Sequence, residues 1–428
     1  MTSYMQKQNL QTLKGFRDFL PAEKRQRDLV ANKIKRAFER YGFEPLETPT
    51  LEYAELLLGK YGDEADKLVY SFTDRGDRQV ALRYDQTVPT ARVLAQYQNE
   101  LGKGFRRYQI QNVFRADKPQ KGRYREFTQC DADIFGSTSP VADAEILAVY
   151  SSIYQDLGLT DLVIELNDRE TLINTLSPYS SSLISVASII QSIDKLDKMS
   201  EEDVIKELVS KGLSNDKASE ALSAIKNAKP SNNLAEIIES AKNLGVSEST
   251  LRFNPALARG LDYYTGMIFE GKIPGDSGSV GGGGRYDRLI ESLGGPIIPA
   301  VGFGLGFDRT VEVMQAKGLL SANQSTQVLV TIFPRPSEAR GEGGNPTLQG
   351  ETLKVAQSLR SSGINTELYP DASDKLEKQL KYADKKGIPY ALVLGQDEVD
   401  QGVVNLKNLA TREQKSLPLE QVIAILKI

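Results

Sequence analysis

Residues 105–136 carry the side chains of this chain that are best suited to chemistry. Three arginines and three acceptor side chains occur there: Arg115, Arg123, Arg125, Gln129, Asp131 and Asp133. Side chains at positions i, i+2 and i+4 of a strand project from one face, so the last three are expected to lie together. Guanidinium groups bind phosphate oxygens through paired hydrogen bonds, and carboxylates bind cations. The stretch therefore predicts a site for a ligand with both anionic and cationic parts.

The same stretch predicts the local structure that would hold these side chains. Apolar and polar residues alternate over 107–114 and again over 125–134, on either side of a basic, turn-rich centre at 116–122. This pattern is typical of two antiparallel strands joined by a long loop. Ordering a long loop costs backbone entropy, so such loops usually have a function. The competing interpretation is a solvated hairpin with ion pairs on its surface, and the stretch by itself favours neither.

The composition restricts the chemistry that is possible. The chain contains no histidine and no tryptophan among its 428 residues, and it has one cysteine. Without imidazole, serine–histidine and cysteine–histidine catalysis are excluded, and so are the usual zinc sites. Catalysis must then depend on arginine, carboxylate, tyrosine and amide groups, with Mg²⁺ as the candidate metal. Phosphate chemistry, which relies on positioning and charge neutralisation, fits this set best.

Length, charge and hydropathy indicate the general class of protein. A chain of 428 residues exceeds one ordinary core, so two or three domains are expected. The chain has 53 basic and 57 acidic residues, so any contact with nucleic acid must use local basic patches. A single cysteine, an N-terminus without the apolar core of a secretory signal and the lack of a membrane-spanning apolar run predict a cytoplasmic protein.

Two further polar residues, Asp85 and Thr87, are expected where a strand over 80–85 passes into a helix. Ligand-binding groups often collect at such junctions. Helix capping is the competing role, and base rates favour it. Upstream, residues 21–41 are predicted to form a helix with an apolar stripe, and residues 43–51 to form a strand.

Glycines mark two later segments. Four consecutive glycines at 281–284 let the backbone approach a ligand or turn sharply, and a flexible linker is the alternative. Alternate glycines over 300–306 would leave one strand face bare for a flat group such as a nucleobase, and close helix packing is the alternative. Arg309 begins the helix that is expected next.

The remaining regions differ in character. Residues 177–246 are predicted to be helical and inserted into a larger domain, and no chemistry is assigned to them. After a linker at 318–327, short buried strands alternate with helices, which predicts a compact α/β domain with a largely parallel sheet. Its predicted strands are 328–333, 364–369 and 390–394, and its predicted helices are 348–359 and 375–382.

Five motifs resemble those of the histidyl-tRNA synthetases, a family of class II aminoacyl-tRNA synthetases. They are FRADKPQKGRYREF, LARGLDYYTGMIFE, GGGGRYD, AVGFGLGFDR and YADKKGIPYALVLG. The resemblance extends from residue 12 to the end of the chain. It implies an α+β class II catalytic domain built on an antiparallel sheet (1–176 and 247–320), a helical insertion domain (177–246) and a C-terminal α/β anticodon-binding domain (326–428). It also implies a homodimer.

The resemblance further implies a reaction. L-histidine would be activated by ATP to histidyl-adenylate and then transferred to tRNA(His), with ATP as a substrate and Mg²⁺ accompanying it. No residue is assigned as a metal ligand. For ATP, the implied residues are Arg115 and Arg259 at the α-phosphate, Arg123 and Arg309 at the outer phosphates, and Phe127 against adenine.

The same resemblance assigns residues to the amino acid and to the tRNA. The implied histidine-binding residues are Asp85, Thr87 and Gln129 at the amino group, Asp133, Tyr264 and Tyr286 at the imidazole, and Arg259 as well. Gln120 is the candidate for the acceptor end of tRNA. The alternative function is that of a histidine-binding regulatory subunit of ATP phosphoribosyltransferase, which would not aminoacylate. That alternative predicts loss of the phosphate-binding arginines and of the C-terminal domain.

Overall fold

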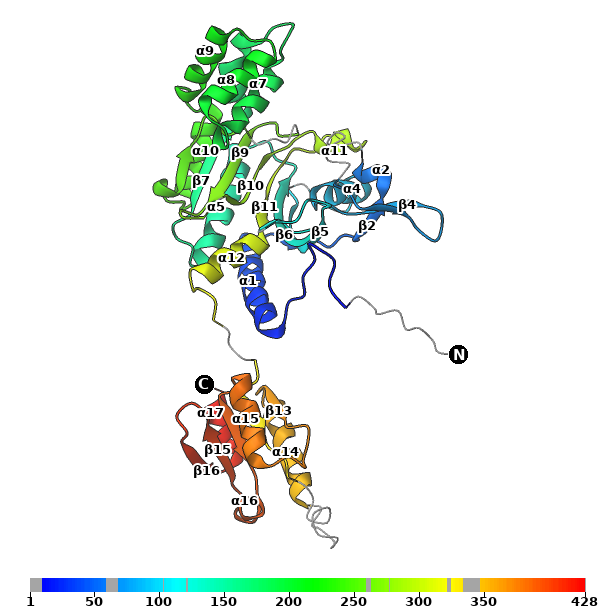
Figure 1. Ribbon diagram of the computed structural model, residues 1–428, viewed down its shortest axis with the longest axis vertical. Coiled ribbons are helices and arrows are strands. Elements are labelled where there is room, and N and C mark those ends of the chain that lie inside the picture. The colour runs from blue at the N-terminus through cyan, green and yellow to red at the C-terminus, as the bar shows by residue number, and fades with distance from the viewer. Residues whose placement is uncertain are drawn as a thin grey trace. The chain divides into compact units, whose positions relative to one another are not determined.

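The computed structural model describes residues 10–58, 68–102, 104–120, 122–258, 263–276, 278–321, 325–333 and 347–427. The chain divides into two compact units, Met1–Ser321 and Ala322–Ile428, here called the N-terminal and C-terminal units. Figure 1 shows the elements of each unit.

An eight-stranded sheet forms the centre of the N-terminal unit. Its strands, in spatial order, are β1 (Glu44–Pro45), β5 (Arg106–Phe114), β6 (Glu126–Phe135), β11 (Ala300–Gly306), β10 (Ser279–Arg285), β9 (Met267–Lys272), β7 (Val163–Asp168) and β8 (Leu251–Phe253). All neighbours from β5 to β7 are antiparallel, and only the two edge pairs are parallel. The predicted antiparallel sheet is confirmed, and so is the predicted hairpin, which is β5 and β6.

One face of this sheet carries the main apolar core. Helices α1 (Pro21–Arg40), α5 (Pro140–Asp156), α10 (Asn232–Asn243) and α12 (Phe307–Ala316) contribute to that core. The predicted stripe of α1 is buried through Val30, Ile34 and Phe38. From the sheet, alternate β6 residues such as Cys130 and Ala132 join the same core. The other face of β6 is therefore left for polar side chains.

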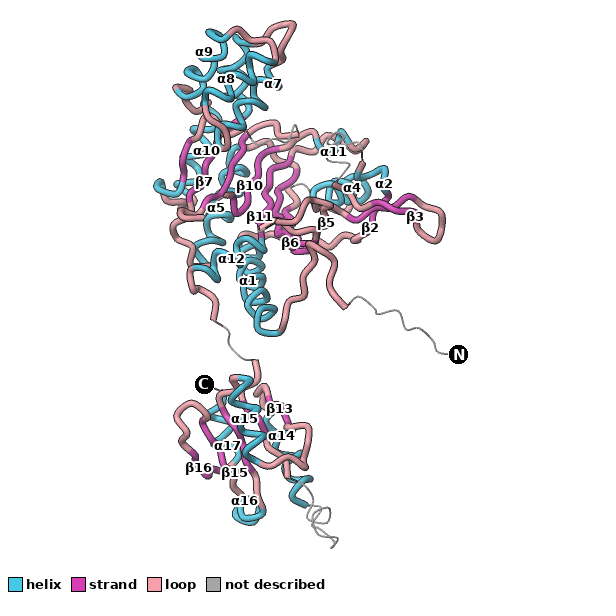
Figure 2. Tube along the Cα trace, viewed as in Figure 1, coloured by secondary structure: helices cyan, strands magenta, loops and turns pink. Residues whose placement is uncertain are grey.

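A three-stranded sheet lies beside the large one, as Figure 2 shows. It consists of β2 (Leu51–Tyr53), β4 (Gln79–Leu82) and β3 (Ser71–Thr73), with α2 (Ala54–Leu57), α4 (Thr87–Tyr97) and α11 (Leu289–Ser292) nearby. The prediction of one strand over 43–51 was wrong, because β1 ends at Pro45 and β2 begins only at Leu51. Pro45 and Pro49 have no N–H to donate to a neighbouring strand, which explains the interruption.

The predicted helical stretch forms helices capped by serine. It contains η1 (Ser177–Tyr179), α7 (Val186–Ile193), η2 (Asp194–Asp197), α8 (Glu201–Ser210), α9 (Asn215–Lys226) and α10, and it follows α6 (Arg169–Leu176). The hydroxyls of Ser185, Ser200, Ser214 and Ser231 each accept a backbone N–H in the first turn of a helix. Whereas α7, α8 and α9 pack with α6, α10 packs on α5 in the main core.

The C-terminal unit contains a five-stranded sheet. Its order is β13 (Thr366–Leu368), β12 (Val328–Val330), β14 (Tyr390–Val393), β15 (Val404–Asn408) and β16 (Gln414–Leu417), accompanied by α14 (Thr347–Ser361), α15 (Leu376–Lys386), α16 (Gln396–Gln401) and α17 (Leu419–Leu426). The first three strands are parallel, but β14–β15 and β15–β16 are antiparallel. The sheet is mixed, so the prediction of a largely parallel sheet was wrong. The final pair is a hairpin whose turn contains Arg412 at φ +64°, and its last strand, β16, is polar and mostly exposed, without the buried apolar run of a parallel strand.

Candidate active site

A cavity of about 610 Å³ opens over the polar face of β6 and β11. Nine of the twelve residues predicted for the site line it: Asp85, Thr87, Arg115, Arg123, Phe127, Gln129, Asp133, Tyr264 and Tyr286. Gln120 and Arg309 are not among the lining residues, and Arg259 lies outside the described residues. Asp131 lines the cavity too, although it received no role above.

Glycines of β11 make room for the side chains of β6. Across the two strands, Gly302 pairs with Asp133 and Gly304 pairs with Asp131. A Cβ on Gly302 would lie 1.8 Å from Asp133 Oδ1, and one on Gly304 would lie 3.0 Å from Asp131 Oδ1. The strand face predicted to be bare thus lies in the cavity, but carboxylates of β6 occupy part of the space above it.

Asp133 is held by two neighbouring side chains. Its Oδ1 accepts a hydrogen bond from the Tyr286 hydroxyl, and its Oδ2 lies 2.5 Å from Nη2 of the fully buried Arg107. Burial raises the pKa of Asp133, and the charge of Arg107 and the Tyr286 hydrogen bond oppose that rise. Arg107 was missed in the sequence, although the hairpin register places it directly opposite Asp133.

The other two carboxylates of the cavity have shifted pKa values. Burial raises the pKa of Asp131 to about 8, and desolvation raises the pKa of Asp85 to about 6. Oδ1 of Asp85 accepts the Val88 N–H at 3.2 Å, which bears out the capping interpretation. Capping does not exclude a second role, because Asp85 also lines the cavity.

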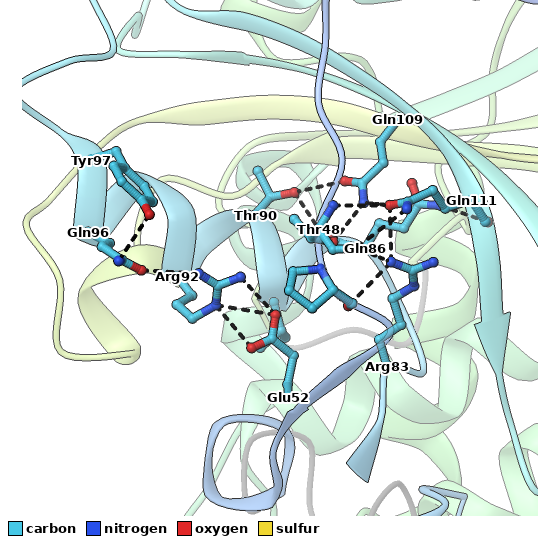
Figure 3. A network of polar contacts seen from close by, with 12 residues as sticks. Thr48, Glu52, Arg83, Gln86, Thr90, Arg92, Gln96, Tyr97, Gln109 and Gln111 are labelled. Atoms are coloured by element: carbon cyan, nitrogen blue, oxygen red, sulfur yellow. Dashed lines mark hydrogen bonds and ion pairs between the residues drawn. The ribbon is translucent and has the colours of Figure 1, made fainter. Parts of the chain in front are cut away.

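Gln86 fixes the start of α4 against the large sheet. Its side chain is fully buried, and its Nε2 donates to the backbone oxygens of Gln111 at 2.9 Å and Gln129 at 3.0 Å. Figure 3 shows Gln86 within a polar network that includes Arg83 and Gln109. Because Gln86 stands between Asp85 and Thr87, its two hydrogen bonds set the position of both relative to β6. The sequence contained no signal for this function, since the partners are backbone atoms.

Arg115 and Arg123 lie between β5 and β6, and Arg309 belongs to α12. Arg115 Nε donates to the Tyr84 oxygen at 2.9 Å, and its Cζ lies 5.2 Å from the centre of the Phe127 ring. Arg123, whose side chain is 58% exposed, lies 3.9 Å from Asp117 in a loose ion pair. Arg309 donates to Asp276 at 3.2 Å. Arg115 and Arg123 line the cavity, and guanidinium N–H groups there can bind the oxygens of a polyanion.

Asp308 joins α12 to β6. Its Oδ2 accepts the Thr128 N–H at 2.8 Å, and its Oδ1 accepts from Arg27 at 2.7 Å and from Arg17. Thr128 follows Phe127 and Asp308 precedes Arg309, so this carboxylate connects the strand that carries Phe127 to the helix that carries Arg309.

The cavity lining therefore combines arginines with carboxylates, as expected for a ligand of mixed charge. Within the described ranges, no group of three or more Asp, Glu or Cys side chains is arranged to hold a metal ion. Nor does any described helix combine the length and apolarity needed to cross a bilayer.

Comparison with known proteins accounts for both units. Residues 15–310 match the family model described as histidyl-tRNA synthetase, and residues 330–427 match that of an anticodon binding domain. The chain is 38% identical to the histidine–tRNA ligase of Gloeobacter violaceus, covering 96% of this chain and 97% of that protein. It is 40% identical to the one of Wolinella succinogenes, covering 94% and 95%. The crystal structure of histidyl-tRNA synthetase from Nostoc sp. PCC 7120 superposes with a TM-score of 0.83 at 30% identity, covering 98% of this chain and 99% of that one.

Proposed function

The chain belongs to the histidyl-tRNA synthetase family, and from this we propose how its cavity performs the reaction of a histidine–tRNA ligase. The protein activates L-histidine with ATP and transfers it to tRNA. The observation that carries the proposal is the cavity itself, which places Arg115 and Arg123 beside three carboxylates in a single site.

Activation requires charge neutralisation more than proton transfer. The carboxylate of histidine attacks the α-phosphorus of ATP, and pyrophosphate leaves. Negative charge grows on the phosphate oxygens, and Arg115 and Arg259 are proposed to stabilise it. Arg123 and Arg309 would hold the outer phosphates, and Phe127 would stack against adenine. A chain without histidine can perform this step because no imidazole base is needed.

The amino acid is proposed to bind at the carboxylate side of the cavity. Asp85, Thr87 and Gln129 would receive its ammonium group. Asp133, Tyr264 and Tyr286 would receive the imidazole, and Asp133 and Tyr286 are already hydrogen-bonded to each other. The same groups would exclude amino acids that lack a ring with donor and acceptor nitrogens.

Mg²⁺ is proposed to enter with ATP. Mg²⁺ prefers oxygen ligands and is often bound by substrate phosphates with one or two carboxylates. The ion would add positive charge at the triphosphate, beside that of the arginines.

Membership of the family supports proposals for the domain boundaries, the partner tRNA and the assembly. We propose the catalytic domain at 1–176 and 247–320, the helical insertion at 177–246 and the anticodon-binding domain at 326–428. Gln120, exposed in the hairpin loop, would contact the acceptor end of tRNA(His). A homodimer in the cytoplasm is proposed as the working form.

ATP–pyrophosphate exchange with each amino acid supplied separately tests the function. We expect exchange with histidine alone, and a loss of about 100-fold or more in Arg115→Ala. Arg78→Ala is the matched control, because Arg78 is 61% exposed and its ion pair with Asp74 lies on the surface, away from the cavity lining. Exchange with another amino acid, or equal losses in both variants, would contradict the proposal.

The alternative function remains distinguishable in the same experiment. A regulatory subunit of ATP phosphoribosyltransferase would bind histidine without exchange. The chain retains Arg115, Arg123 and Arg309, and its residues 330–427 match an anticodon binding domain, which favours the ligase. Histidine binding in a calorimeter without exchange would favour the alternative instead.

A further inference from the structure

Asp131 and Asp133 lie two residues apart on β6 and both line the cavity, but their surroundings differ. Asp133 accepts from Tyr286 with one oxygen and pairs with Arg107 through the other. Its charge is therefore balanced inside the protein, before any ligand arrives.

Asp131 has a different environment. Its side chain is 2% exposed, and its Oδ2 accepts from Gln129 Nε2 at 3.2 Å. No described residue donates a hydrogen bond to its Oδ1. A buried carboxylate oxygen without a donor is costly, so such an atom on a cavity wall is well placed to accept from a ligand. Gly304, opposite Asp131, has no side chain that would cover the atom.

The charges that face Asp131 indicate which ligand group it accepts. They are Asp85 before α4, Asp133 on its own strand and Arg107 on β5. Arg115 also acts on Asp85. Three carboxyl groups therefore share two arginines, and when all three are ionised this part of the cavity can balance one further positive charge. Histidine carries a full positive charge on its ammonium group at neutral pH, whereas its imidazole is largely neutral there.

We propose that Asp131 joins Asp85, Thr87 and Gln129 at the ammonium group of bound histidine and supplies a second carboxylate that pairs with it. In this arrangement Asp133 is a fixed acceptor, held by Arg107 and Tyr286, and its charge is not available to the ammonium. The inference rests on the proposed function and adds a specificity-determining residue to it.

The pairing has a consequence for protons. Burial raises the pKa of Asp131 to about 8, and Asp133 and Asp85 reinforce this while Arg107 opposes it. The ligand-free carboxyl is thus largely protonated at pH 7, and an ammonium beside it lowers its pKa and expels the proton. Binding of histidine then releases a proton and becomes tighter as the pH rises from 6 to 8.

Asp131→Asn tests the pairing, with Asp133→Asn for comparison. We expect Asp131→Asn to raise the KM for histidine by about 10- to 100-fold, the value of a charge-assisted hydrogen bond. The KM for ATP should change by less than about twofold, because Asp131 is on the amino-acid side. The dependence of the histidine KM on pH between 6 and 8 should become flatter. Asp133→Asn should keep a pH dependence but shift it to lower pH, because loss of the Asp133 charge lowers the pKa of Asp131.

Binding calorimetry separates this inference from the proposed function. Titrations of histidine in buffers of different ionisation enthalpy should show proton release by the wild-type protein and much less by Asp131→Asn. Imidazole-4-propionate, which lacks the ammonium, should bind both proteins equally. Equal proton release, or an equal loss of affinity for histidine and imidazole-4-propionate, would overturn the inference.

These binding results stand whether or not the wild-type protein catalyses exchange, so failure of the proposed function is recognised separately. Circular dichroism establishes that Asp131→Asn is folded. If it is not, Asp131→Glu keeps the charge, and it should retain proton release. Loss of proton release in a folded Asp131→Glu would overturn the inference.

Discussion

In the N-terminal unit, β6 buries Cys130 and Ala132 on one face and presents Asp131 and Asp133 to a cavity on the other. In the C-terminal unit, β12 is buried on both faces, because Val328 and Val330 belong to one apolar cluster and Leu329 to another. In the large sheet, the buried polar groups on the cavity face need hydrogen-bond or charged partners. In the C-terminal sheet, β12 is covered on both faces and offers neither face to a ligand. A sheet that is covered on both faces must bind its partners through edges, loops or helices.

Arg107→Met should produce the largest effect, because it removes the charge that compensates Asp133. We expect the free energy of unfolding to fall by about 3–5 kcal/mol. The deficit should be smaller at pH 5 than at pH 8, since protonation of Asp133 removes the uncompensated charge. Urea titrations followed by circular dichroism at the two pH values measure it. Arg106→Met is the control, because Arg106 pairs with Glu145 at a half-exposed position; a loss as large in the control would refute the argument.

Leu329→Ala tests the doubly buried sheet. Leu329 is fully buried, so truncation should destabilise the C-terminal unit by about 3 kcal/mol. Histidine-dependent exchange at temperatures below the transition should remain at the wild-type level, since no residue of the cavity changes. Leu353→Ala, at a position 47% exposed, should cost much less. If Leu329→Ala lost exchange activity as well as stability, activity in the N-terminal unit would depend on the C-terminal unit.

Gly302→Ala tests the space that glycines provide in the first sheet. The added methyl group would lie 1.8 Å from Asp133 Oδ1, so that carboxylate must move. A displacement of this size in a binding site should lower exchange by about 100-fold. Gly102→Ala is the control, because a methyl group added there would meet no atom of the described residues within 4 Å. Equal activities of the two variants would mean that the position of Asp133 is unimportant.

Asp131→Asn should have the smallest effect on the free energy of unfolding, and it should raise that free energy where the other variants lower it. The folded protein holds a proton on Asp131 up to about pH 8, whereas the unfolded chain loses it near pH 4. The wild-type protein therefore loses stability as the pH rises between these values. Without ligand at pH 8, the variant should be more stable than wild type by about 1–2 kcal/mol. Thermal unfolding from pH 5 to 8 measures the difference, and a difference that does not grow with pH would count against the shifted pKa.

The sequence predicted those elements whose pattern is local. Alternation over 107–114 and 125–134 predicted β5 and β6, and the apolar stripe predicted α1. The prediction of one strand over 43–51 failed because two prolines interrupt its hydrogen bonding. The pair β15–β16 was missed because β15 has only two alternating apolar residues, Val404 and Leu406, and β16 is polar and mostly exposed.

Residues that line the cavity were predicted where side chains share a strand face, as Gln129 and Asp133 do. Residues that act through partners distant in sequence were not predicted. Gln86 acts through backbone oxygens, and Asp308 acts through a backbone N–H and two arginines. The distinction between Asp131 and Asp133 depends on which of the two lies opposite Arg107, and that requires the register of the sheet.

The two titrating carboxylates of the cavity also make this protein suited to magnetic resonance. In most proteins, groups that change charge between pH 5 and 8 are histidines, but this chain has none. Every imidazole signal from a sample containing labelled histidine therefore belongs to the substrate. The ionisation and tautomer of the bound ring can be followed without background, and carboxyl carbon shifts of Asp85 and Asp131 report the protein's side of the same equilibrium.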